Sequence, residues 1–191
     1  MIAARGLAKR FGDKRVFAGV DVALPDSGFL LVTGPNGSGK TTLLRVLARL
    51  AAPTAGTLEL PERREIGYLG HEPLVYRELT PLENLNLFGR LYRVPDRGER
   101  VGMLLERFGL WEVRHDRVSS FSRGMQQRLG LCRVLLHSPT LLLFDEPTNS
   151  LDAEGLALLD GVFAETGRTW VVATHDPARV EHLATERLAF A

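Results

Sequence analysis

The feature that most constrains the fold is "GPNGSGKT", residues 34–41, which directly follows the short apolar run "GFLLVTG". It fits G-x-x-x-x-G-K-S/T at every position, and "TTLLRVLARL" behind it has the apolar spacing of a helix. Gly34, Gly37 and Gly39 allow the backbone to curl so that its N–H groups point inward. A strand, a glycine-rich loop and a helix in this order predict a phosphate-binding loop.

The residues of this loop have separate predicted roles. Lys40 is expected to reach the β- and γ-phosphates of a nucleotide, and Thr41 to hold Mg²⁺ through its hydroxyl, while Thr42 continues onto the helix. Lysine occurs at only three positions of the chain, 9, 14 and 40, so a lysine inside the loop supports the assignment. The predicted nucleotide-binding residues of the loop are Gly34, Pro35, Asn36, Gly37, Ser38, Gly39, Lys40, Thr41 and Thr42.

Two adjacent carboxylates end a second apolar run, "TLLLFDEP" at residues 140–147. Such a run predicts a buried strand with Asp145 and Glu146 at its end. Asp145 suits the coordination shell of Mg²⁺, usually through water. Glu146 is positioned to orient or deprotonate an attacking water. Beside a phosphate-binding loop, these acids indicate chemistry on a nucleotide phosphate.

Strand signals on one side of the chain give way to a helical segment in its middle. Residues 1–24 alternate apolar and polar positions, as an antiparallel hairpin would. "GTLEL" and "EIGYLG" also have the composition of strands. Within 71–138, "TPLENLNLFGRLY" has Thr80 as a helix N-cap, Pro81 at the first helical position and Glu83 completing a capping box. Two more amphipathic helices follow, so this segment is predicted to be a helical insert.

Strands and helices alternate again after the insert, which implies an α/β sheet with covered faces. The predicted strands are 140–147, 169–176 and 187–191, separated by a helix at 153–166 and a short helix begun by Asp176 and Pro177. We therefore predict one domain, residues 1–191, with a catalytic core of about 1–70 and 139–191 and an insert of about 71–138.

Composition bears on nucleic-acid binding, membrane insertion and disulfide formation. The net charge is +1, and 45% apolar and 25% charged residues are ordinary for a soluble globular protein. A near-neutral chain gives no electrostatic argument for binding nucleic acid or an anionic membrane. No apolar run approaches the length of a membrane-spanning helix, so a membrane role has to come through a partner. Cys132 is the only cysteine, which excludes an intrachain disulfide and favours a buried packing role in "LGLCRVLL".

Five motifs in order resemble those of the nucleotide-binding subunit of ABC ATPases. "GPNGSGKT" is similar to Walker A and "LLLFDE" to Walker B with its glutamate, while "NSLD" at 149–152 resembles the D-loop and "ATHD" carries a switch histidine, His175. The signature, usually LSGGQ, resembles "FSRGM" at 121–125, which keeps Ser122 and Gly124. The resemblance covers nearly the whole chain and implies a P-loop NTPase: a RecA-like, mostly parallel sheet core, an N-terminal antiparallel β subdomain and a helical insert subdomain.

The resemblance also implies that the signature motif "FSRGM" binds phosphate. In this family two subunits stack head to tail around two Mg-ATP, so that Ser122 and Gly124 of one subunit meet the γ-phosphate bound to the other. Asp152 is expected to contact the opposite subunit near its Walker A motif. His175 is expected to contact the γ-phosphate and the catalytic Glu146, which makes Glu146, His175 and Lys40 the predicted catalytic residues.

Two further positions follow from the resemblance. An aromatic residue near the N-terminus usually stacks on adenine in this family, and Phe11 occupies that place, with Phe17 as the less favoured choice. His71 stands where the Q-loop glutamine normally approaches the metal shell, so the predicted metal-site residues are Thr41, Asp145 and His71. A histidine differs from an amide in reach and protonation. The stretch "YLGHEPLVYRELTPLENL" around it resembles the haem-exporter ATPase of the cytochrome c maturation system.

These observations predict an ATP-binding and ATP-hydrolysing subunit that drives a transmembrane permease from the cytoplasmic face of the cell membrane. The resemblance around His71 implies haem export as the transport function. The helical insert, with the 71–90 region beside it, is the predicted docking surface for the permease, and "LVYRELT" is the stretch to test first. One alternative is a soluble ABC ATPase acting on DNA or ribosomes. Such relatives usually carry coiled-coil arms or two cassettes, neither of which is present here, and we expect no nucleic-acid partner. Another alternative is a simple P-loop kinase, which would not explain "FSRGM", "NSLD" and "ATHD" together.

Overall fold

The computed structural model describes residues 1–149 and 151–190, which fold into two compact units. The first unit consists of Met1–Gly70, Thr140–Pro147 and Thr166–Ala191, and the second of His71–Pro139 and Thr148–Glu165. A boundary after residue 70 was also predicted from the sequence. Residues 148–165 were predicted to belong to the core, whereas the structure groups this segment with the helices.

A five-stranded parallel sheet forms the core of the first unit. Its strand order is β5-β6-β7-β3-β8, and every neighbouring pair is parallel. The strands are β3 (Phe29–Thr33), β5 (Ile66–Leu69), β6 (Leu141–Asp145), β7 (Thr169–Ala173) and β8 (Glu186–Ala189). Every residue of β6 and β7 is buried, which explains why these strands are nearly continuous apolar runs. In this order β7 lies between the strand before the glycine-rich loop and the strand that ends in acids.

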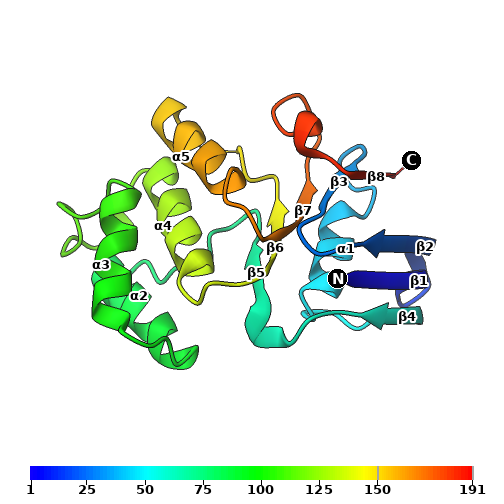
Figure 1. Cartoon of the computed structure of the whole chain (residues 1–191), viewed down its shortest axis with the longest axis horizontal. Coiled ribbons are helices and arrows are strands. Elements are labelled where there is room, and N and C mark those ends of the chain that lie inside the picture. The colour runs from blue at the N-terminus through cyan, green and yellow to red at the C-terminus, as the bar shows by residue number, and fades with distance from the viewer. Residues whose placement is uncertain (150, 191) are drawn as a thin grey trace. The chain divides into compact units, whose positions relative to one another are not determined.

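A three-stranded antiparallel sheet faces the same core. Its order is β2-β1-β4, from β1 (Ile2–Phe11), β2 (Lys14–Leu24) and β4 (Ala55–Glu59). Val20, Val22 and Leu24 are buried with exposed residues between them, the alternation expected of a sheet with one solvated face. Helix α1 (Lys40–Leu47) lies between the two sheets (Figure 1), and its apolar side chains share one hydrophobic cluster with both. The predicted hairpin and parallel core are confirmed.

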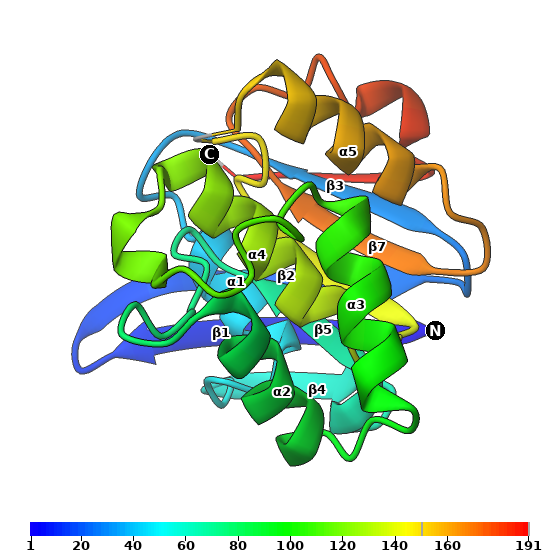
Figure 2. The same cartoon turned by 90° about the vertical axis from the view of Figure 1, so that its left-hand side faces the viewer.

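The described part of the second unit contains four α-helices, which are labelled in Figure 2. They are α2 (Pro81–Leu91), α3 (Arg97–Arg107), α4 (Arg123–Leu135) and α5 (Ala153–Phe163). Ion pairs join α5 and the residues after it to the other helices, Arg128 with Glu154 at 3.2 Å and Arg107 with Glu165. These contacts give a physical reason why 148–165 groups with the helices. None of the described helices is long and apolar enough to cross a membrane.

Helix α2 begins with the predicted capping box. Thr80 Oγ1 accepts the Glu83 N–H at 3.2 Å, and Glu83 Oε2 accepts the Thr80 N–H at 2.8 Å. The bond from the Thr80 backbone lowers the pKa of Glu83 below its ordinary value, and the Thr80 hydroxyl adds to this shift. Elsewhere in the unit Cys132 is fully buried, and burial raises the pKa of its thiol, as expected for a packing residue.

The short helix predicted from Asp176 and Pro177 is wrong. The described residues of this segment contain only a 3-10 turn at Glu181–Leu183. Residues 1–149 and 151–190 contain two more such turns, at Arg63–Glu65 and Val118–Ser120. Asp176 Oδ1 instead accepts the Ala178 N–H at 3.3 Å, and Asp176 N–H bonds to Thr174 Oγ1. Local side-chain bonds of this kind compete with helix formation and favour turns.

Candidate active site

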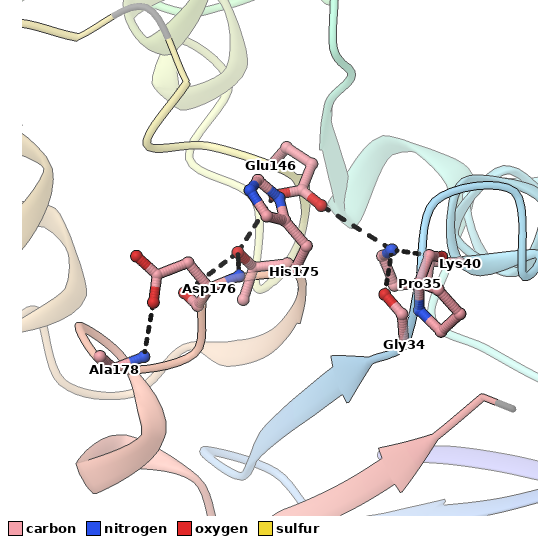
Figure 3. A network of polar contacts seen from close by, with 8 residues as sticks. Gly34, Pro35, Lys40, Glu146, His175, Asp176 and Ala178 are labelled. Carbon is pink, nitrogen blue, oxygen red and sulfur yellow. Dashed lines mark hydrogen bonds and ion pairs between the residues drawn. The ribbon is translucent and has the colours of Figure 1, made fainter.

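The site is built at one edge of the parallel sheet. Because β3, β6 and β7 are parallel, their carboxyl ends meet at the same edge, where open α/β sheets bind ligands. The loop 34–39 follows β3, Glu146 follows β6, and His175 lies just beyond β7. Since β7 is the middle of these strands, His175 comes to lie near Glu146, whose carboxylate in turn points toward the loop (Figure 3).

The loop has a backbone that requires glycine. Gly34 has φ of 145°, and a Cβ there would lie 2.7 Å from the carbonyl oxygen of Phe190. Gly39 has φ of 112° and is the N-cap of α1, where the first helical N–H groups are free for an anion. The Ser38 hydroxyl is buried and makes no hydrogen bond within the described part of the chain. A loop with these features fits a bound phosphate chain.

Lys40 projects its ammonium group into the loop. Nζ donates to the Gly34 carbonyl at 2.7 Å and to the Pro35 carbonyl at 3.1 Å, and it lies 3.9 Å from Glu146 Oε1 (Figure 3). The side chains of Lys40 and Glu146 are only 6% and 12% exposed, so their charges interact with little screening by solvent. The predicted lysine and glutamate thus lie in one network.

Glu146 sits in a strained turn. Its φ is 50°, a conformation that costs about 1–2 kcal/mol for a residue with a Cβ. The Glu146 N–H donates to the Ala173 carbonyl at 2.8 Å, which ties this turn to the end of β7. Glu146 Oε2 lies 2.9 Å from His175 Nδ1 and 3.1 Å from Thr174 Oγ1, while Oε1 faces Lys40. Strain of this kind is found where a catalytic side chain must be held in place.

The residues predicted to hold Mg²⁺ have suitable chemistry. Thr41 and Thr42 lie in the first turn of α1, and Asp145, 1% exposed, ends β6. Hydroxyl and carboxylate oxygens are the ligands that Mg²⁺ prefers, and it usually keeps several waters. The described residues contain no cluster of three or more His, Cys, Asp or Glu side chains that could form a complete metal cage. This donor set therefore fits a cation shared with a nucleotide, and the assignment stays a prediction.

The two aromatic candidates for adenine stacking differ in exposure. Phe11 ends β1 and is 57% exposed, with the Lys9 ammonium 4.7 Å from the centre of its ring. Phe17 is 6% exposed and packs edge-on against Phe190. Only Phe11 therefore offers a ring face to a ligand, which agrees with its choice from the sequence, and its contact with adenine stays a prediction.

The signature and D-loop residues belong to the second unit, where they cap helices. Ser122 is the N-cap of α4, with Oγ accepting the Met125 N–H at 3.2 Å, and Gly124 lies in the first turn. Asp152 is the N-cap of α5 and accepts the Gly155 N–H at 2.8 Å. Ser150 of "NSLD" lies outside the described residues. Capping does not conflict with contacts to a second subunit, which stay predictions.

His71 opens the second unit and is exposed. Together with Arg123 and Gln126 it lines a cavity of about 290 Å³ beside the start of α4. The cavity is also lined by Glu72, Pro73 and Gln127. The contact of His71 with a metal shell stays a prediction.

Comparison with known proteins identifies the family. The sequence profile of a family described as "ABC transporter" matches residues 17–149, which is more than half of the chain. The chain belongs to the ABC transporter family. Its Walker A and Walker B motifs fall within the matched residues. ABC domains of this kind bind ATP and are ATPases. The assignment of the nucleotide to the sheet edge described above stays a prediction.

Several ABC proteins are similar over most of the chain. The cytochrome c biogenesis ATP-binding export protein CcmA of Cupriavidus necator is 38% identical over 188 residues, covering 92% of this chain and 83% of that protein. The lantibiotic transport ATP-binding protein SrtF of Streptococcus pyogenes is 32% identical over 194 residues, covering 96% of this chain and 84% of that protein. Other curated relatives are longer, and the chain spans only 55% of one that is 40% identical.

A solved structure extends the likeness to three dimensions. The ATP-binding cassette MJ0796, described as a dimer in a post-hydrolysis state bound to ADP and Pi, has a TM-score of 0.85 and 27% identity. The match covers 100% of this chain and 94% of that one. The predicted α/β P-loop fold is confirmed.

Thr174 is a residue of this candidate site that was not predicted from the sequence. Thr174 is 2% exposed and contacts Glu146 directly, but it lies in "ATHD" as the residue before the histidine that drew attention. A polar residue at the end of the buried run "TWVVA" was the signal that could have identified it, because buried hydroxyls need a partner.

Proposed function

We propose that this chain binds Mg-ATP and hydrolyses it as the ATP-driven subunit of a transporter. The observation that carries the proposal is the arrangement of Glu146, with Oε1 3.9 Å from Lys40 Nζ and Oε2 2.9 Å from His175 Nδ1. It offers a base at one end of a buried network and a cation for phosphate oxygens at the other.

Each residue of the network has a role in this proposal. The N–H groups of the loop and of the first turn of α1 bind the phosphate chain, and Lys40 neutralises its β- and γ-oxygens. Mg²⁺, held on the protein side by Thr41 and Asp145, would supply further neutralisation of the phosphate charge. Glu146 accepts a proton from the water that attacks the γ-phosphorus, and the bond to the β–γ bridging oxygen breaks to release ADP. His175 orients Glu146 and contacts the γ-phosphate.

We include a second copy of the chain in the working unit. Ser122 is the N-cap of α4 and Gly124 lies in its first turn, where free backbone N–H groups favour an anion. The phosphate loop of the same chain already accounts for the nucleotide bound there, so these residues are available for a second nucleotide. The proposal is that they bind the γ-phosphate held by the second copy, with Asp152 at the same interface. The dimeric form of MJ0796 supports this. A transmembrane permease would use the closing and opening of this dimer, with the chain bound to the permease at the cytoplasmic face of the membrane.

Phosphate release from Mg-ATP by the purified chain tests this function. We expect turnover in the parent protein and none in Lys40→Ala. Absence of ATP binding by the parent in titration calorimetry would refute the proposal. Turnover is also measured with added DNA, with ribosomes and with membrane vesicles from the source cells. Stimulation by DNA or ribosomes would favour the soluble ABC ATPase, and stimulation by membranes would favour the transporter subunit.

We propose haem as the cargo. The stretch "YLGHEPLVYRELTPLENL" resembles haem-exporter ATPases, and CcmA is among the similar proteins, although SrtF, named for lantibiotic transport, is similar over a comparable length. Complementation of a strain lacking its own haem-exporter ATPase tests this choice. Restored holocytochrome c would support it, and failure despite normal expression would count against it.

A further inference from the structure

The carboxylate of Glu146 has an anchor besides the switch histidine. Thr174 follows β7 directly, and its Oγ1 lies 3.1 Å from Glu146 Oε2. The same hydroxyl lies 3.2 Å from the Asp176 carbonyl and accepts the Asp176 N–H at 3.1 Å. A hydroxyl has one proton to donate, so it is shared between the Glu146 carboxylate and the Asp176 carbonyl.

These bonds fix the orientation of the threonine. Because the Asp176 N–H reaches back to Oγ1, the hydroxyl oxygen is held in the turn that follows β7. Thr174 is also β-branched, which restricts rotation about χ1. Its hydroxyl therefore faces Glu146 as part of the backbone turn, with little conformational freedom to lose.

Thr174 and His175 differ in how firmly they can hold Glu146. The His175 side chain is 53% exposed and lines a cavity of about 420 Å³ beside Gly34 and Pro35. It has room to change rotamer, whereas Thr174 is 2% exposed. Both contact Oε2, so Oε1 is left to face Lys40 and the loop.

We infer that Thr174 is a positioning residue for the general base. It holds Oε2 of Glu146 so that Oε1 points at the water beside the γ-phosphate, including when His175 turns away from the carboxylate to contact the nucleotide. The inference rests on the proposed hydrolysis of ATP. It assigns to Thr174 no contact with the nucleotide itself.

Three variants of the full chain test this role. Thr174→Val keeps the shape but removes the hydroxyl, Thr174→Ala repeats the loss if valine disturbs folding, and Thr174→Ser keeps the hydrogen bonds. Thr169→Val is the matched control, because Thr169 is a buried threonine at the other end of β7 whose Oγ1 accepts the Ser27 N–H at 3.0 Å, far along the strand from Glu146.

The expected result is a split between turnover and binding. Thr174→Val lowers kcat about tenfold to a hundredfold, in line with the loss of a hydrogen bond to a charged group, and leaves the KM for ATP within about twofold. Thr174→Ser stays within about threefold of the parent kcat, and Thr169→Val changes thermal stability but not kcat. In a Glu146→Gln background, Thr174→Val causes no further loss, since the base that it positions is gone.

Contrary results are distinguishable. Turnover in the parent with undiminished kcat in both Thr174→Val and Thr174→Ala would overturn the positioning role alone. A rise in KM with unchanged kcat, or an additive loss in the double variant, would overturn it as well. No turnover in the parent, with ATP bound, would overturn the proposed function and the positioning role with it.

Discussion

Glu146→Gln is expected to trap an ATP-bound dimer. The amide is nearly the size of the carboxylate, and its oxygen can take the place of Oε2, where it still accepts from Thr174 at about the observed 3.1 Å. Its nitrogen then takes the place of Oε1, 3.9 Å from Lys40 Nζ. The side chain keeps its position but can no longer accept a proton from water.

The size of the expected loss of turnover follows from the role of Glu146 as general base. Removing a positioned general base costs on the order of a hundred- to ten-thousand-fold in rate, or about 3–5 kcal/mol in the barrier. Lys40 retains its bonds to the Gly34 and Pro35 carbonyls, so the phosphate loop is expected to survive and ATP affinity to stay close to that of the parent. The γ-phosphate then persists, and with it the contact proposed for Ser122 and Gly124 of the second copy.

Light scattering in each nucleotide provides the assay. We expect Glu146→Gln to be a dimer with Mg-ATP and a monomer with ADP, while the parent dimerises only transiently. Glu186→Gln, which changes an exposed glutamate of β8, is the control for charge and should behave as the parent. A Glu146→Gln monomer with ATP demonstrably bound would refute the link between the base and dimer release in the isolated chain. Undiminished turnover would show that Glu146 is not the base.

Four further outcomes follow from the structure. Lys40→Ala should lose most of its ATP affinity in calorimetry, because no other cation of the loop replaces its charge; unchanged affinity would contradict its role. Ser122→Arg should abolish hydrolysis but leave ATP binding by the monomer unchanged. Ser122→Ala, which loses the same cap of α4, should keep part of the turnover. Full turnover of the arginine variant would disprove the contact across the dimer. His71→Gln should leave ATP binding unchanged and alter mainly the stimulation of turnover by the membrane partner. A large loss of basal turnover would instead reveal a chemical role for the histidine. Thr80→Ala should lower the free energy of unfolding by about 1 kcal/mol, since it removes the cap of α2. Because the pKa of Glu83 is lowered in the folded state, the stabilisation that its carboxylate contributes is present at neutral pH and is lost as the pH falls through that pKa. Denaturant titrations in acid and at pH 7 measure this difference.

Local patterns in the sequence determined the chemistry of the phosphate loop and most elements of the fold. Glycines at positions 34 and 39 are needed because the backbone there adopts positive φ, and that requirement acts within the loop itself. The capping box of α2 is likewise formed by residues three apart in the sequence. The apolar runs of β6 and β7 identified buried strands because both faces of each are covered. Such signals can be read without knowledge of the tertiary structure.

The tertiary structure alone decided which of these groups meet. Glu146 and Thr174 are 28 residues apart, and their contact depends on β6 and β7 being neighbours in register, Asp145 beside Ala173. The short helix expected at Asp176 gave way to a turn because that same threonine binds the Asp176 N–H. Phe11 and Phe17 are both aromatic residues of one hairpin, and packing into the hydrophobic core, which includes an edge-on contact with Phe190, buried the second while the first stayed exposed. Strand order and side-chain packing are set by contacts between distant segments, which periodicity along the chain does not encode.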